Sequence, residues 1–343
     1  MNAVYLVSRG DVPCIEVRPD PRPVPEPGQV LVRMRAASVN RVDLYMRDSG
    51  IGITHTLPQI MGVDGAGIVE EVGEGSPLSV GQAVVVHPGL ACGKCEFCRR
   101  GDGVLCERIR ILGEHCHGTM RTWLQVPETN VFPMPRELDF VQGAALGVNY
   151  LTAWRMVFTQ AALRAGETVL ICGIGGGVSI AAMQLAKLAG ARVIVTSRSQ
   201  AKLDRARFEG ADGGVRTDDP DFLRSIDALT GGRGVDVVFD NIGAKVWDLA
   251  LRSLVRGGRL VLCGATTGSK PPADLQRIFV RQLKIFGSTL GNFGEFADLL
   301  RFVELHSIKP LIDSTHTVTQ IHAALERMEA DERFGKVVVT FPA

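Results

Sequence analysis

The sequence has no excess of charge of either sign and no long apolar run. Its 38 lysines and arginines nearly cancel its 37 aspartates and glutamates, so the formal net charge of the 343 residues is +1. A balanced chain offers no basic surplus to hold a nucleic-acid backbone or an anionic membrane surface. Its uncharged apolar runs are all shorter than the roughly 18 residues that a membrane-spanning helix needs. We therefore expect neither nucleic acid nor a membrane among its partners.

The start of the chain lacks the apolar core of a secretory signal peptide, and residues 1–10 include Arg9. We therefore expect a cytoplasmic protein, in a compartment where thiols stay reduced. In that setting the eight cysteines are expected to bind metal or to pack as small apolar residues, because disulfides rarely persist there.

The length favours two domains, since a domain typically takes about 150 residues. Short strand-like runs that end at glycine or proline occupy residues 30–37, 67–73 and 83–88. Such runs predict a compact β-rich unit in the first part of the chain.

A different pattern begins near residue 150, where apolar runs alternate with helical stretches. The apolar runs are residues 168–172, 191–196, 235–239 and 259–263. Continuous apolar strands that alternate with helices predict a parallel sheet covered on both faces, so the fold class is α/β. The expected domains are residues 1–147, residues 148–292, and a return of residues 293–343 to the first domain through a last strand at 335–341.

A cluster of glycines lies between the first parallel strand and its helix. It comprises Gly173, Gly175, Gly176 and Gly177, followed by Val178. Glycines let a backbone approach a pyrophosphate closely, and the following helix offers free N–H groups and a positive dipole. The spacing departs from the strict G-x-G-x-x-G pattern, but its place between strand and helix predicts a dinucleotide site.

The end of the second parallel strand indicates which dinucleotide binds. An acidic residue there would hold the ribose 2′-hydroxyl of NAD. The segment 196–202 has no carboxylate and instead contains Ser197, Arg198 and Lys202. Arginine and lysine suit a 2′-phosphate, so we expect NADPH in preference to NADH. The alternative is that both cations are ordinary solvated surface residues.

Four cysteines lie close together, at Cys92, Cys95, Cys98 and Cys106. Four thiolates at this spacing predict a closed tetrahedral zinc site, which stabilises a loop and leaves no position for water. We expect one such structural zinc per chain, in a lobe at about residues 90–108. By contrast, His115, Cys116 and His117 offer too few ligands for a metal centre.

Several blocks give the chain a family resemblance. They are the four-cysteine lobe, the segment 62–67 (GVDGAG), the segment 150–154 (YLTAW), the glycine turn and the segment 264–268 (GATTG). In content and order they resemble the medium-chain dehydrogenase/reductase superfamily, that is, the zinc-type alcohol dehydrogenases and their quinone oxidoreductase relatives.

This resemblance implies a GroES-like β-barrel catalytic domain and a Rossmann domain. It further implies that Thr152 neighbours the nicotinamide and that Asn241 and Gly264 belong to the cofactor site. It also implies a homodimer or homotetramer, joined through the edge of the Rossmann sheet near residues 283–289.

The departures from the family pattern concern the catalytic zinc of the alcohol dehydrogenases. At the positions of its first two ligands this chain has Asn40 and Val63, the third ligand would fall near Val148, and Val42 replaces a proton-relaying hydroxyl. Asp64 remains, but one carboxylate does not hold a catalytic zinc. The pair Asn40 and Asp43 resembles the quinone and enone reductase branch.

The resulting hypothesis is hydride transfer from NADPH to a quinone or an α,β-unsaturated carbonyl compound without a catalytic zinc. We expect Asn40 to donate to the developing oxyanion and Asp64 to orient a nearby group, unless it forms only a structural ion pair. Tyr150 is a candidate proton donor.

Tyr45, His55 and His87 are further candidates for the proton donor, although each more often packs or bonds locally. Two other functions stay open: an NADP-dependent alcohol or aldehyde oxidoreductase with a rebuilt metal site, and a non-enzymatic NADPH-binding protein. The identity of the substrate and the physiological direction are not readable from the sequence.

Overall fold

The computed structural model describes residues 2–10, 14–53, 55–73 and 75–342. The chain divides into two compact units. Unit 1 comprises Met1–Leu151 and Leu290–Ala343, and unit 2 comprises Thr152–Thr289. The sequence prediction places the boundaries after residues 147 and 292.

Unit 1 is built on a sheet of seven strands among the described residues. The strands in hydrogen-bonding order are β10 (Val131–Pro133), β6 (Ala83–Val86), β5 (Asp64–Val72), β3 (Gln29–Val39), β18 (Lys336–Thr340) and β17 (Ile312–Thr317), with β9 (Trp123–Pro127) also paired to β3. The long strand β3 lies at its centre. A tight fit to β5 explains Gly67, because a Cβ there would lie 2.4 Å from the carbonyl oxygen of Arg33.

Two smaller sheets and several short helices complete unit 1. The small sheets contain β2 (Ile15–Pro19), β1 (Asn2–Leu6) and β4 (Gln59–Ile60), and β7 (Gly89–Leu90) with β8 (Arg110–Ile111). The helices are α1 (Arg41–Asp48), α2 (Glu96–Arg99), α3 (Phe140–Gly143), α10 (Phe293–Leu305) and α11 (Ile321–Glu329), with short turns η1 (Gly103–Leu105), η2 (Glu128–Asn130), η3 (Leu146–Tyr150) and η5 (Val318–Gln320).

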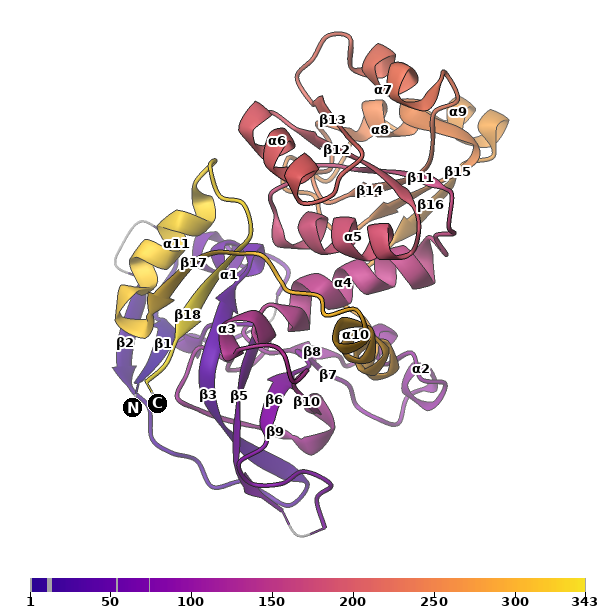
Figure 1. The fold of residues 1–343 in the computed structure, drawn as a ribbon. Coiled ribbons are helices and arrows are strands. Elements are labelled where there is room, and N and C mark those ends of the chain that lie inside the picture. The colour runs from indigo at the N-terminus through magenta and orange to yellow at the C-terminus, as the bar shows by residue number, and fades with distance from the viewer. Residues whose placement is uncertain (1, 11–13, 54, 74, 343) are drawn as a thin grey trace. The chain divides into compact units, whose positions relative to one another are not determined.

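The last strand returns to the first part of the chain, as the sequence predicts. Strand β18 pairs antiparallel with β3, with Val337 opposite Val39. Figure 1 shows β18 at the yellow end of the colour scale beside the indigo β3. Both strands contribute buried valines to one apolar core, so this pairing is driven by burial of side chains far apart in sequence.

Unit 2 is a six-stranded parallel sheet in the order β13-β12-β11-β14-β15-β16. The strands are β11 (Thr168–Ile171), β12 (Arg192–Ser197), β13 (Gly213–Arg216), β14 (Val235–Asp240), β15 (Leu254–Leu262) and β16 (Lys284–Gly287). Numbered from β11, this order is 3-2-1-4-5-6, which is the Rossmann order. The predicted fold class, α/β with a GroES-like and a Rossmann domain, is confirmed.

Helices cover both faces of this sheet. They are α5 (Gly177–Leu188), α6 (Gln200–Phe208), α7 (Phe222–Thr230), α8 (Trp247–Ser253) and α9 (Leu275–Arg281), with η4 (Arg155–Gln160) before β11 and α4 (Leu151–Trp154) at the junction of the units. Figure 1 shows α5 on one side of the sheet and α8 on the other. Because both faces are covered, the central strand β14 is buried along its whole length, which explains its apolar sequence.

Candidate functional site

The four cysteines predicted to bind zinc come together in unit 1. Their ligand atoms all lie within 4.8 Å of one another. The Sγ atoms of Cys92 and Cys98 are 4.0 Å apart, and those of Cys95 and Cys98 are 3.4 Å apart. Zinc–sulfur bonds of about 2.3 Å in a tetrahedron place sulfurs at about this separation. The donor set therefore fits a structural zinc held by Cys92, Cys95, Cys98 and Cys106.

Backbone groups around this cluster favour thiolates. The N–H groups of Cys92 and Arg108 point at Cys106 Sγ, at 3.3 and 3.4 Å. Backbone N–H groups of Lys94 and Cys95 lower the pKa of Cys92 to about 6, whereas burial and the neighbouring thiols raise the pKa of Cys98 to about 12. Thiolate is the form that binds a metal, so these N–H groups prepare Cys92 for one.

The loop is tied to the start of helix α10. Asn292, the residue before that helix, accepts from the N–H of Val104 at 2.9 Å and donates to Asp102 Oδ1 at 3.1 Å. Both contacts join the cysteine loop to the rest of unit 1 without any metal.

A buried polar network lies where β3, β5 and β18 meet. Asn40 donates from Nδ2 to Asp64 Oδ1 at 3.0 Å and to the carbonyl oxygen of Ser38 at 3.2 Å. The Asn40 Oδ1 atom accepts from Lys336 Nζ at 2.7 Å and from Asn149 Nδ2 at 2.6 Å. An asparagine amide has two N–H groups and two lone pairs, so the side chain of Asn40 is fully hydrogen-bonded.

The two carboxylates of the network accept further bonds. Asp64 accepts from Ser38 Oγ at 2.5 Å and from the backbone N–H of Val148 at 3.2 Å. Asp43 accepts from the backbone N–H groups of Asn40 and Gly62, at 2.7 and 3.1 Å. Asn40 and the backbone of Val148, which lie at or near positions where the sequence resemblance implies zinc ligands, thus both contact Asp64.

Burial governs the protonation of these groups. It raises the pKa of Asp64, although Lys336 and the hydrogen bonds of Ser38 and Asn40 oppose the shift. It raises the pKa of Asp43 to about 7 and lowers that of Lys336 to about 8. The nearby Glu114 has its pKa raised to about 7 by burial and by Asp43. The ammonium of Lys336 thus balances the charge of only one of the two carboxylates, Asp43 and Asp64. The raised pKa values favour a proton on the other carboxyl group near neutral pH.

The contacts and burial of Asn40, Tyr150 and Tyr45 can be compared with the catalytic roles predicted for them from the sequence. Asn40 is predicted to donate to substrate, but both of its N–H groups already bond protein oxygens, so donation would require a bond to break. Tyr150 is only 1% exposed. Tyr45 is exposed and donates to the carbonyl oxygen of Ile51. The proton-donor assignments therefore stay predictions.

The sequence interpretation missed Lys336, Asn149 and Ser38 as members of this network. Lys336 had a visible signal, because it is the one charged residue in a run of valines that reads as a buried strand. Asn149 and Ser38 gave no local signal, because their partners come from other strands.

Four histidines considered for function or metal binding bond mainly to backbone groups. His87 is buried, and its Nδ1 accepts from the N–H of Gly89 at 3.1 Å while Nε2 faces the carbonyl oxygen of Gly291 at 3.0 Å. Burial lowers the pKa of His87 to about 4, so it is neutral at neutral pH. His115 and His117 accept from different backbone N–H groups, those of Ile111 and Ile60. His55 contacts Arg9 and the carbonyl oxygen of Ile53.

The predicted dinucleotide residues of unit 2 surround the turn between β11 and α5. Gly173 and Gly175 have φ of +70° and +110°, and a Cβ on Gly173 would lie 2.4 Å from Ile242. Gly176 is the N-cap residue of α5, and Gly177 and Val178 begin the helix. The side chain of Asn241 lies beside this turn, and its buried oxygen has no hydrogen-bond partner among the described residues.

This turn fits the pyrophosphate of a dinucleotide. The helix start offers free N–H groups, and the glycines leave room for the phosphates. The unpartnered oxygen of Asn241 can only accept, so it suits an N–H or O–H donor of the cofactor and not the phosphates. Gly264 lies against the backbone of Asn241, where a Cβ would be 2.9 Å from its carbonyl oxygen. Thr152, predicted to neighbour the nicotinamide, is buried in α4.

The end of β12 carries the residues predicted to choose the cofactor. Ser197 is buried and its Oγ accepts from the N–H of Ser199, whereas Arg198 is exposed and Lys202 half-buried in the first turn of α6. Arg216 lies directly opposite Ser197 on the neighbouring strand and pairs with Asp218 through two bonds of 2.9 and 2.6 Å. The sequence interpretation missed Arg216, because only the pairing of β12 with β13 brings it here.

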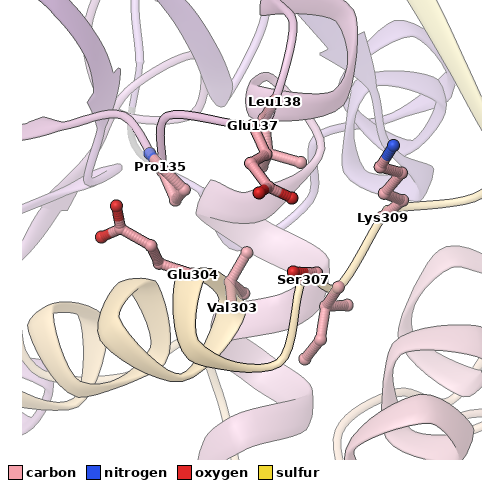
Figure 2. A pocket seen from close by; sticks show the side chains of 8 residues that line it. Pro135, Glu137, Leu138, Val303, Glu304, Ser307 and Lys309 are labelled. Atoms are coloured by element: carbon pink, nitrogen blue, oxygen red, sulfur yellow. The ribbon is translucent and has the colours of Figure 1, made fainter.

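A separate surface depression lies elsewhere in unit 1 (Figure 2). Pro135 and Leu138 on the segment before α3, and Val303 at the end of α10, form its apolar part, and Glu137, Glu304 and Lys309 stand at its rim. None of its lining residues belongs to the polar network or to the cysteine cluster. It therefore does not contribute to the site described above.

Comparison with known proteins identifies the family. A family model described as "Alcohol dehydrogenase GroES-like domain" matches residues 26–136, and one described as "Zinc-binding dehydrogenase" matches residues 177–304. A protein of Saccharolobus solfataricus named "NAD-dependent alcohol dehydrogenase" is 30% identical over 99% of both chains. The chain belongs to the medium-chain dehydrogenase/reductase superfamily.

Other members show the breadth of this superfamily. A rat protein named "Quinone oxidoreductase" is 29% identical over 99% of this chain and 97% of its own length. A solved structure titled "Crystal Structure of NAD-dependent alcohol dehydrogenase" matches all of both chains at 39% identity, with a TM-score of 0.95. The protein is therefore an oxidoreductase of a superfamily whose members use NAD(P) and zinc. Among the described residues, no helix has the length and apolar character to cross a membrane.

Proposed function

We propose that the protein transfers hydride from NADPH to a quinone or an α,β-unsaturated carbonyl compound, without a catalytic zinc. The observation that carries this proposal is the donor set at the family's catalytic zinc position. Two of the three ligand positions are valines, and the third is Asn40, whose oxygen already accepts from an ammonium 2.7 Å away.

Such a donor set does not fit zinc. A buried ammonium in contact with the only side-chain oxygen at the three ligand positions repels a second cation, and Asp64 alone is too few ligands. Alcohol oxidation in this fold depends on a Lewis acid to stabilise the alkoxide. Reduction of a conjugated carbonyl compound needs less help, because the acceptor itself delocalises the incoming charge.

The proposed reaction balances as follows for an enone. NADPH, when bound, supplies the hydride and becomes NADP⁺. The acceptor gains this hydride at its β-carbon, and the electron pair of its C=C bond moves toward the carbonyl oxygen. A proton from water or a nearby hydroxyl then adds to the α-carbon, giving the saturated carbonyl compound.

The buried network is proposed to fix the polar side chains near the acceptor before charge develops on its carbonyl oxygen. Asn40 connects the network because it bonds Asp64 through Nδ2 and Asn149 through Oδ1. Tyr150 remains the proposed source of the proton, within the η3 turn that also carries Val148.

NADPH is proposed over NADH on the charges at the end of β12. Arg198 and Lys202, with Ser197, offer cations and a hydroxyl for a 2′-phosphate. Arg216 lies opposite Ser197, but its charge is paired with Asp218, so it is not counted toward the phosphate site. Gly173, Gly175, Gly176, Gly177, Val178, Asn241, Gly264 and Thr152 are proposed to hold the rest of the cofactor.

The decisive assay follows NADPH oxidation with a panel of quinones, enones, aldehydes and ketones. We expect turnover with at least one quinone or enone and little with simple aldehydes. Turnover of alcohols or aldehydes alone would favour the activity named for the relatives, and tight NADPH binding without any turnover would indicate a non-enzymatic protein. Either result would refute the proposal.

We also propose that the protein is a cytoplasmic homo-oligomer, a dimer or a tetramer, joined along the edge of the unit 2 sheet. In the part of the chain that the structure describes, strand β16 pairs only with β15, and helix α9, which precedes β16 in the chain, carries Leu275 and Phe279, each 68% exposed. An unpaired strand edge flanked by exposed apolar residues is an efficient surface for a second copy.

Phe279→Asp should shift the protein to a smaller species in light scattering. The introduced charge would be desolvated at the interface, so association is expected to weaken at least about tenfold. Phe208→Asp, another exposed phenylalanine of unit 2 on helix α6, is the matched control and should leave the mass unchanged. A wild-type protein that is monomeric at all concentrations would contradict the proposal.

A further inference from the structure

The hydrogen bonds of the buried network have a fixed direction. An ammonium can only donate, and a carboxylate that receives several N–H and O–H groups can only accept. Lys336 therefore requires the oxygen of Asn40 on its side, and Asp64 requires the nitrogen of Asn40 on the other. If the Asn40 amide were turned over, its nitrogen would face the ammonium of Lys336, and its oxygen would face Asp64 and the carbonyl oxygen of Ser38. All of these contacts are repulsive in a buried site, so the orientation of the amide is set from both ends.

The fixed orientation of the Asn40 amide also fixes the orientation of the Asn149 amide. Because the oxygen of Asn40 faces it at 2.6 Å, Asn149 must present its Nδ2 to Asn40. The second N–H of Asn149 and its Oδ1 make no further hydrogen bond with the described residues. One N–H of Asn149 is thus fixed by its bond to Asn40, and its other N–H and its oxygen are available for a ligand.

The position of Asn149 is favourable for contact with a ligand. It is 7% exposed, against 4% for Asn40 and Lys336 and 0% for Asp64, so it is the most accessible of these four residues. It lies in the π-helical turn η3, three residues before Thr152. Such turns are rare and often mark functional sites, since they displace a side chain from the regular helical face.

We propose that Asn149 donates the hydrogen bond to the carbonyl oxygen of the acceptor, and that Lys336, acting through Asn40, is the positioning residue that aims it. This inference rests on the proposed function. It transfers the donor role from Asn40, whose N–H groups are used, to the neighbouring amide with an unused N–H. The hydrogen bond from Asn149 to the carbonyl oxygen of the acceptor becomes stronger as this oxygen gains negative charge during hydride transfer. A bond that is stronger in the transition state than in the bound substrate raises the rate and does not merely tighten binding.

The first test is Asn149→Ala with the enone or quinone that the wild type reduces best. We expect kcat to fall about 10²-fold, with a smaller change in KM, because loss of one oxyanion donor has about this effect. Binding of NADPH, followed by fluorescence, should not change. The matched control is Asn130→Ala, which removes a buried asparagine that bonds the carbonyl oxygens of His87 and Gly89. It should lower thermal stability and leave kcat within about twofold of the wild type.

The second test separates positioning from a merely structural role. Lys336→Met should also lower kcat, and the double variant Lys336→Met with Asn149→Ala should be no slower than Asn149→Ala alone, because Lys336 acts through Asn149. Lys336→Arg keeps a cationic donor and should recover most of the activity. If Lys336→Met does not fold, the double variant Lys336→Met with Asp64→Asn removes the buried ammonium together with the buried carboxylate. Adding Asn149→Ala to this double variant should leave kcat unchanged, because Asn149 is then no longer positioned.

The dependence of kcat on pH provides a third readout. The charged groups that act on Lys336 are Asp64 and Asp43, which favour its ammonium form, and Arg333, which opposes it. Its pKa is lowered to about 8 by burial, so the wild-type kcat should fall as the pH rises through that value and the fixed direction is lost. Lys336→Arg should not show this decline, because arginine stays protonated.

The outcomes separate the two proposals. A wild type that reduces enones or quinones while Asn149→Ala is equally active would overturn the inference and leave the proposed function intact. Losses that multiply in the double variant would overturn the role of Lys336 as a positioning residue. A wild type without any such turnover would overturn both.

Discussion

Replacing Arg198 with alanine should raise the KM for NADPH by about 10²-fold and change the KM for NADH by no more than about twofold. A bond between a guanidinium and a phosphate is charge-assisted, and its loss in a binding site amounts to about 1.5–3 kcal/mol, or one to two powers of ten. NADH has no 2′-phosphate, so it should not respond. Steady-state kinetics with both cofactors provide the measurement.

Arg192→Ala is the matched control for this experiment. Arg192 is an exposed arginine at the opposite end of the same strand, β12, away from the carboxyl ends where cofactors bind. It should leave both KM values unchanged. A wild type that clearly prefers NADH would refute the assignment of the cofactor, and the names of the relatives make this comparison necessary.

Replacing Cys98 with serine should remove the zinc and lower the melting temperature by about 10 °C. Cys98 Sγ contacts the sulfurs of both Cys92 and Cys95, so it is central to the cluster. Metal binding provides a large part of the stability of such loops, and a few kcal/mol in a chain of this size corresponds to a shift of this order. Zinc analysis and differential scanning calorimetry give the two readouts.

Cys116→Ser is the control, since Cys116 is a free thiol outside the cluster. It should retain the zinc and the melting temperature. At low temperature the Cys98→Ser protein should keep the kcat of the wild type, because the metal holds a loop and takes no part in the reaction. Loss of kcat in proportion to loss of zinc, in protein that is still folded, would contradict a structural role.

The features that the sequence predicts well are those in which local pattern and physical requirement coincide. A parallel strand covered on both faces must be apolar, so the strands of unit 2 were visible as runs of valine, leucine and isoleucine. The spacing of Cys92, Cys95 and Cys98 required only a short loop to bring their sulfurs together. The glycines near Gly173 were visible because the turn there has positive φ and no room for a side chain.

The polar network was less accessible to prediction, for a physical reason. Lys336 meets Asn40 only because β18 pairs with β3, a contact between residues 296 positions apart. A sequence pattern shows which residues are buried, but not which buried polar groups satisfy one another. The role predicted for Asn40 assumed a free amide, and only the contacts of Lys336, Asp64 and Asn149 show that its bonds are used.

The central claim is that hydride transfer proceeds without a metal ion next to Asn40 and Asp64. It is tested most directly by measuring the zinc content of active protein together with anomalous scattering at the zinc edge. The account predicts one zinc per chain, among Cys92, Cys95, Cys98 and Cys106, in protein that reduces an enone or a quinone. A second zinc bound at Asp64 in the active protein would contradict it.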